Sequence, residues 1–178
     1  MNAPNEIFLE IFNNLRASHR SLFSCLLVNR RWCINIVPIL WSEPRYYDRR
    51  LIRTCLLSLN AEEQALFIPF KIMLPNEPKP LFEYTSYITS INYYLNDGIK
   101  NWLKYEGCKV PEDAVKYSLI AMFLRTSKKL KYLTTFNYDD IAELLIDVLY
   151  KNTAIITLNL NGNQLDKAKA LAEALSWF

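Results

Sequence analysis

The fold is decided by residues 4–41, PNEIFLEIFNNLRASHRSLFSCLLVNRRWCINIVPILW. Apolar side chains recur at spacings of three and four over residues 7–15, which predicts one helix with an apolar stripe. Pro4 suits the first turn of this helix, because its missing N–H would have no helical partner there. A shorter apolar run over residues 22–28 predicts a second helix after a polar break.

A third helix is expected to follow at once. Asn29 is the kind of residue that caps a helix through its side-chain oxygen, and Trp32 lies in the apolar stretch that comes next. Pro38 is expected to end or bend this helix, because proline lacks the N–H that an interior position needs. Trp41 follows directly.

The three helices carry more apolar side chains than they can hide. From Ile7 to Trp41, 20 of 35 residues are Ile, Leu, Val, Phe, Trp or Cys. A unit of about 40 residues is only marginally able to form its own core. The excess must therefore contact a partner protein, the remainder of the chain, or both.

The pattern of this segment resembles the F-box family. The resemblance is carried, in order, by Pro4-x-Glu6-Ile7-x-x-x-Ile11-Phe12-x-x-Leu15, by Leu27-Val28-x-Arg30-Arg31-Trp32 and by Trp41. It implies that residues 1–45 form a three-helix F-box, which binds the Skp adaptor of Skp–cullin–F-box ubiquitin ligases and through it a cullin. The family's apolar positions, some in the core and some facing the adaptor, correspond here to Pro4, Ile7, Ile11, Leu15, Leu27, Val28, Trp32 and Trp41.

One residue departs from the family pattern. F-box sequences usually have leucine before the proline, whereas this chain has Ala3. Loss of a fully buried leucine removes apolar contact of about 1–2 kcal/mol. The substitution therefore predicts weaker binding to the adaptor.

Residues 46–80 are expected to form a helical connector with a Pro-rich loop. Residues 51–59 are apolar with arginines on one side, which predicts a helix. Asn60 followed by Glu63 is typical of the start of another short helix. The prolines at 69, 75, 78 and 80 then predict a surface loop or linker.

Residues 81–127 are predicted to be helical. Tyr87, Ile91, Tyr94 and Leu95 are expected to share one helical face. A second face is expected to carry Ile99, Trp102 and Leu103, with Tyr105 as a further candidate. A turn is expected around Gly107, followed by an apolar helix over residues 114–124. The many aromatic residues of this region are expected to lie in the core, and a ligand site is the alternative interpretation. They are Phe82, Tyr84, Tyr87, Tyr93, Tyr94, Trp102 and Tyr105.

The C-terminal part contains a repeat. Residues 158–175, LNLNGNQLDKAKALAEAL, are similar to a leucine-rich repeat of the ribonuclease-inhibitor type. The repeat pattern begins at Ile155, and a degenerate copy begins about 25 residues earlier, at Leu130; this period is typical of β–α solenoids. Residues 128–178 are thus predicted to form about two repeat units. The fold class expected is mainly α, ending in a short α/β solenoid fragment, and the layout is similar to F-box/leucine-rich-repeat proteins of fungi.

No catalytic, cofactor-binding or metal site is expected. Three glycines are too few and too far apart for a phosphate-binding loop. The one histidine, His19, is expected in a surface turn, and the four cysteines lack the spacing of metal ligands. Cysteines without a pairing pattern are typical of a reducing compartment, which predicts the cytoplasm or nucleus. No signal peptide or membrane span is expected.

The sequence leaves three functions open. The first is a non-enzymatic adaptor that binds Skp through the F-box and an unknown protein target through the C-terminal region. The alternative is a repeat scaffold or decoy protein without ligase function. The third is binding of nucleic acid through the arginines at 45–53, which is unlikely because the net charge is only +3.

Overall fold

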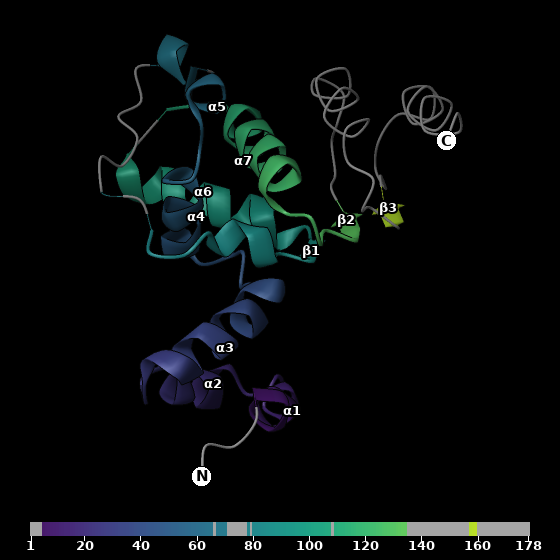
Figure 1. The fold of residues 1–178 in the computed structure, drawn as a ribbon. Coiled ribbons are helices and arrows are strands. Elements are labelled where there is room, and N and C mark those ends of the chain that lie inside the picture. Colours follow the sequence, from purple (N-terminus) through teal and green to yellow (C-terminus); the bar gives the residue numbers. More distant parts are fainter. Residues whose placement is uncertain are drawn as a thin grey trace. The chain divides into compact units, whose positions relative to one another are not determined.

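The computed structural model describes residues 5–65, 67–70, 78, 80–107, 109–134 and 157–159. Two compact units make up the chain, Met1–Pro44 and Arg45–Phe178. Ala3, Pro4 and most of the predicted repeat region, residues 135–156 and 160–178, lie outside the described residues. The prediction of a mainly helical chain is confirmed, since seven α-helices occupy most of the described part (Figure 1).

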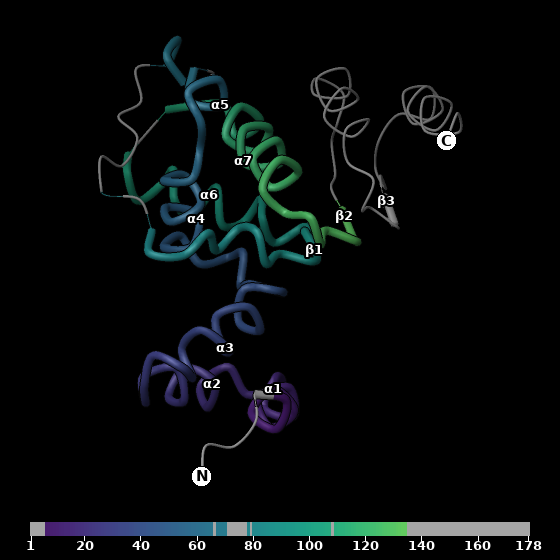
Figure 2. Tube along the Cα trace, viewed as in Figure 1, coloured from purple at the N-terminus to yellow at the C-terminus, as the bar shows by residue number. Residues whose placement is uncertain are grey.

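The first unit contains the three helices expected from its apolar spacing. They are α1 (Asn5–Asn14), α2 (His19–Leu26) and α3 (Arg30–Ser42). Both α1 and α2 pack against α3 (Figure 2). Phe12, Leu22 and Ile36, one from each helix, are buried at the centre of this small core. Further half-buried side chains surround them: Phe8, Leu15, Cys25, Leu26, Trp32, Ile39 and Leu40.

The two ends of α3 show one confirmed expectation and one correction. Asn29 caps α3 as predicted, and its side-chain oxygen accepts a hydrogen bond from the backbone N–H of Trp32 at 2.9 Å. Pro38 does not end the helix, which continues to Ser42. The last turn is held by packing of Ile39 and by the Ser42 hydroxyl, which accepts a hydrogen bond from Arg16 at 2.7 Å.

The described part of the second unit contains four α-helices. These are α4 (Arg49–Leu56), α5 (Ala61–Ala65), α6 (Tyr94–Glu106) and α7 (Glu112–Thr126). Helix α6 packs against both α4 and α7, and α5 packs against α7 (Figure 1). Residues Ile68–Phe70 and Tyr84–Tyr87 form the 3₁₀ turns η1 and η2. Helix α7 is buried over most of its length, including Lys116 and Ser118, so it forms the centre of this unit.

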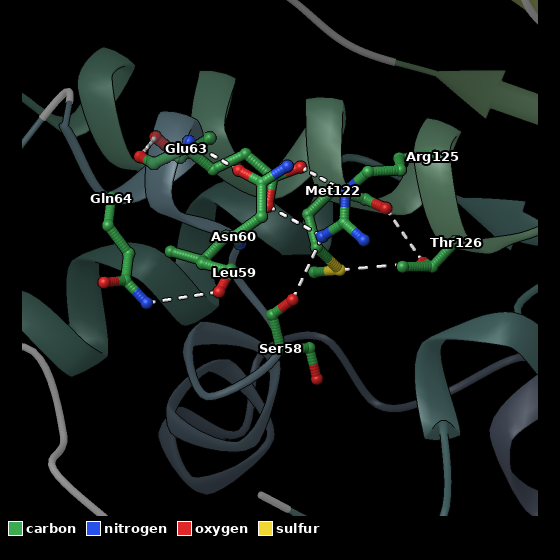
Figure 3. A network of polar contacts seen from close by, with 9 residues as sticks. Ser58, Leu59, Asn60, Glu63, Gln64, Met122, Arg125 and Thr126 are labelled. Atoms are coloured by element: carbon green, nitrogen blue, oxygen red, sulfur yellow. Dashed lines mark hydrogen bonds and ion pairs between the residues drawn. The ribbon is translucent and has the colours of Figure 1, made fainter.

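A capping box and an ion pair attach α5 to α7. Asn60 and Glu63 cap each other's backbone N–H groups at 2.8 Å in both directions, as their spacing predicts. The Glu63 carboxylate also accepts two hydrogen bonds from Arg125 of α7, each 2.8 Å long (Figure 3). Arg125 donates a further hydrogen bond to the carbonyl oxygen of Ser58 at 3.0 Å.

Three short strands form a parallel sheet in the order β1 (Ser90–Ile91), β2 (Tyr132–Thr134) and β3 (Thr157–Asn159). Tyr132 pairs with Ser90 on one side and with Thr157 on the other. The pairing of β2 with β3 thus joins residues 25 positions apart, which equals the repeat length read from the sequence. Residues 135–156 lie outside the described residues, and the leucine-rich repeat stays a prediction.

The helix predicted across Tyr87 and Tyr94 is wrong. Residues 88–93 are extended or irregular and contain β1, and the side chains of Ile88 and Ile91 are fully buried there. Helix α6 begins only at Tyr94, whose backbone N–H donates to the side-chain oxygen of Asn92 at 3.1 Å. This local hydrogen bond competes with a continuous helix.

The aromatic core predicted for residues 81–105 is also wrong in most of its members. Of the seven aromatic residues, only Trp102 is buried. Tyr93, Tyr94 and Tyr105 are exposed, because a tyrosine can leave its hydroxyl in water while its ring covers apolar surface. The face formed by Ile99, Trp102 and Leu103 is confirmed, since all three are buried on α6.

Two glycines have distinct structural roles, one inside α6 and one directly after it. Gly107 ends the helix in the left-handed conformation, with φ 66°, at the predicted turn. Gly98 lies where α6 approaches the main chain, and a Cβ there would be 1.8 Å from the carbonyl oxygen of Tyr46. The helix can come this close only because residue 98 has no side chain.

Candidate protein-interaction surface

The first unit exposes a large share of its apolar side chains. On α1, Phe8 and Phe12 turn to the core, where their rings contact Trp32 at centroid distances of 5.7 and 5.2 Å. Ile7 and Ile11 lie one helical turn apart on another face, and each is 48% exposed. Helix α1 is therefore apolar on two faces, of which its own core uses one.

A second group of exposed apolar residues lies at the end of α2 and just beyond it. Leu27 is 68% exposed, and Phe23 and Val28 are each 58% exposed. The backbone N–H groups of Leu27 and Val28 donate to the carbonyl oxygens of Ser24 and Cys25, so the chain remains tightly turned here. Ile34 of α3 is also exposed. So many exposed large apolar side chains on one small unit are typical of a protein-interaction surface.

The predicted adaptor-binding residues fall into three groups. Ile7, Ile11, Leu27 and Val28 are exposed and available to a partner. Leu15 and Trp32 pack against the core of the first unit, and Trp41 is half-buried. Pro4 lies outside the described residues.

Three exposed apolar residues were missed by the sequence reading, namely Leu9, Phe23 and Ile34. Each lies beside core residues in the sequence, and the apolar spacing alone does not separate the two faces of α1 or α2. Only the position of α3 decides which face is covered. We call the seven exposed residues the apolar surface of the first unit; they are Ile7, Leu9, Ile11, Phe23, Leu27, Val28 and Ile34.

Comparison with protein families identifies a family that matches this unit. Residues 4–46 match the family model described as F-box-like. The chain carries an F-box-like domain. The matched region corresponds to the first compact unit, which ends at Pro44, and it includes every exposed residue of the apolar surface. No solved structure matches the chain.

The F-box-like domain indicates a general role for the apolar surface. F-box domains attach proteins to Skp-type adaptors of ubiquitin ligases, so a general adaptor role follows from the match.

No group of His, Cys, Asp and Glu in the described part of the chain could hold a metal ion. Among those same residues, no helix is long and apolar enough to cross a bilayer.

The arginines at 45–53 are mostly engaged within the second unit. Arg50 forms an ion pair with Asp48 at 2.7 Å, and this hydrogen bond lowers the pKa of the Asp48 carboxyl. Arg53 lies 3.4 Å from Glu106. Tyr46 lies between these arginines in the sequence, but it is buried, and burial raises the pKa of its hydroxyl. The tyrosine donates to the carbonyl oxygen of Ser90 at 2.8 Å.

His19 is not in a surface turn as predicted. It is the first residue of α2 and is half-buried. Ser18 precedes it as the N-cap residue without a side-chain capping bond. The local polar sequence is therefore the start of a helix.

Proposed function

We propose that the chain is the substrate-recognition adaptor of a Skp–cullin–F-box ubiquitin ligase. The F-box-like domain would bind a Skp adaptor and through it a cullin, while the second unit would hold a protein target. The chain would do no covalent chemistry itself. It would raise the concentration of the target near the ubiquitin-carrying enzyme, in the cytoplasm or nucleus.

The observation that carries the proposal is the apolar surface of the first unit. Burying one exposed leucine or isoleucine side chain contributes about 1.5–3 kcal/mol. Seven exposed apolar side chains in one unit of 44 residues, all at positions inside the family match, support a protein contact made by this unit. The described side chains of the second unit differ, because most of its exposed large apolar residues are tyrosines.

We further propose that residues 128–178 form about two leucine-rich-repeat-like units, as in the fungal proteins with a similar layout. The parallel pairing of β2 with β3 at an offset of 25 residues supports this proposal. Parallel strands need a crossover connection of a dozen or more residues, and this spacing leaves room for one helix per repeat.

Substitution of the apolar surface tests the proposal. Leu27→Asp should weaken binding of the full chain to a purified Skp adaptor by about 3 kcal/mol, or about a hundredfold, because it removes apolar contact and buries a charge. Ile11→Asp should act in the same direction. Both residues are exposed, so folding should survive. Leu15→Asp is unsuitable, because Leu15 packs against the core.

The matched control is Asn13→Asp on α1. Asn13 is exposed and polar, so its substitution adds the same charge without removing apolar surface. It should leave adaptor binding within about twofold of the wild type. If the wild-type chain fails to bind a Skp adaptor by calorimetry, the proposal is wrong. If it binds but a reconstituted ligase never modifies the protein held by the second unit, the scaffold or decoy alternative is correct.

A further inference from the structure

An open hollow on the second unit combines aromatic walls with basic side chains. It has a volume of about 670 Å³ and lies between the start of α4 and the last half of α6. Its lining comes from Tyr47, Asp48, Arg49, Asn101, Lys104 and Tyr105. We call it the Tyr47–Tyr105 hollow. Every lining residue belongs to the second unit, and none lies in the F-box-like domain.

The walls of the hollow are fixed by contacts between α4 and α6. The Arg49 guanidinium lies 3.5 Å from the centre of the Tyr105 ring, which is a cation–π contact. Asn101 donates a hydrogen bond to the carbonyl oxygen of Tyr47 at 3.1 Å. The Tyr47 ring also contacts Tyr94 edge to face, with ring centroids 6.3 Å apart. A ligand would therefore meet a site that is already formed.

The charge available in the hollow is positive. Asp48 is its one acidic lining residue, and its carboxylate is occupied by Arg50 and by the cap of α4. Neither Arg49 nor Lys104 forms an ion pair with a carboxylate of the described residues. Arg49 and Lys104 thus line the hollow together with one acidic residue, Asp48, whose carboxylate is paired with Arg50.

We propose that the Tyr47–Tyr105 hollow binds an acidic segment of a target protein. Two cations in a fixed frame suit one or two carboxylates, and the exposed rings of Tyr47 and Tyr105 can cover the apolar part of the segment. A nucleic acid fits less well, because it needs a longer row of cations to follow its phosphates. The inference rests on the proposed function in one respect, since it assigns the kind of target that the adaptor would hold.

Binding of a glutamate-rich peptide to the full chain tests this inference. A fluorescein-labelled peptide should bind in a fluorescence-anisotropy titration, and its affinity should fall as salt is raised. Lys104→Glu should weaken binding about tenfold, because it places like charges together. The matched control is Lys100→Glu, which lies one turn away on α6. Lys100 does not line the hollow, and its ammonium group lies 3.7 Å from the carboxylate of Glu112. It should change the affinity by less than about threefold.

Three results would overturn the inference. These are equal losses in the two lysine variants, equal binding of the same peptide with glutamine in place of glutamate, and binding of a single-stranded oligonucleotide at the hollow in preference to the peptide. Binding to the Skp adaptor is measured on the same preparations. A wild-type chain that does not bind the Skp adaptor would count against the proposed function alone. A wild-type chain that does not bind the peptide would count against the proposed role of the hollow alone.

Discussion

Replacement of Gly98 by alanine should destabilise the second unit. The new Cβ would lie 1.8 Å from the carbonyl oxygen of Tyr46 and 2.9 Å from its carbonyl carbon, both main-chain atoms. Normal contact would require α6 and this main chain to separate by more than about 1 Å. Tyr46 resists that movement, because it is buried, hydrogen-bonded to Ser90 and packed edge to face on Phe123.

The expected size follows from two opposing effects. Overpacking costs about 1–3 kcal/mol, and a main-chain contact that cannot yield places this site at the upper end. Alanine gains about 1 kcal/mol over glycine inside a helix. The net loss should be about 2 kcal/mol in the free energy of unfolding. Urea unfolding followed by circular dichroism measures this loss directly, and the midpoint of thermal unfolding should fall by about 4–8 °C.

Gly107→Ala is the matched control for this prediction. No atom lies within 4 Å of a Cβ at residue 107, so this substitution suffers only from the positive φ of 66°. Its cost should be about 1 kcal/mol, and the packing of α6 on Tyr46 should be unchanged. A Gly98→Ala protein as stable as the wild type, or more stable, would refute the close approach of α6 to Tyr46.

Two further predictions concern the polar network and the thiols. Glu63→Gln should lower the free energy of unfolding by about 1–2 kcal/mol, because it weakens the charged hydrogen bonds to Arg125; a urea midpoint equal to that of the wild type would contradict this. Cys55 is fully buried and its pKa is raised by burial, so iodoacetamide should modify native Cys25 and Cys33 at least about tenfold faster than Cys55; peptide mapping by mass spectrometry would detect the opposite order.

Local signals in the sequence predicted local structure well. Asn29 and the Asn60–Glu63 pair act on backbone groups three residues away, so their roles could be predicted without knowledge of the fold. The apolar spacing of the first segment likewise predicted three helices, all of which are present. The general family of that segment was also recognised from its motifs, and the family match confirms it.

Features that depend on distant parts of the chain could not be read in this way. Helix α1 is apolar on two faces, and only packing on α3 shows that Phe12 is covered while Ile11 is not. In the sequence, Gly98 is only a residue that weakens a helix. The structure shows that the main chain of Tyr46 lies against it. The Tyr47–Tyr105 hollow joins residues more than 50 positions apart, and no sequence motif links them.

The parallel sheet has a consequence for the order in which the chain assembles. Ser90 pairs with Tyr132, and helices α6 and α7 lie between these two residues in the sequence. Closing so long a loop is entropically unfavourable until local contacts have shortened it. We therefore expect packing of α6 against α7 to precede the pairing of β1 with β2 during folding, because it shortens the loop that this pairing must close.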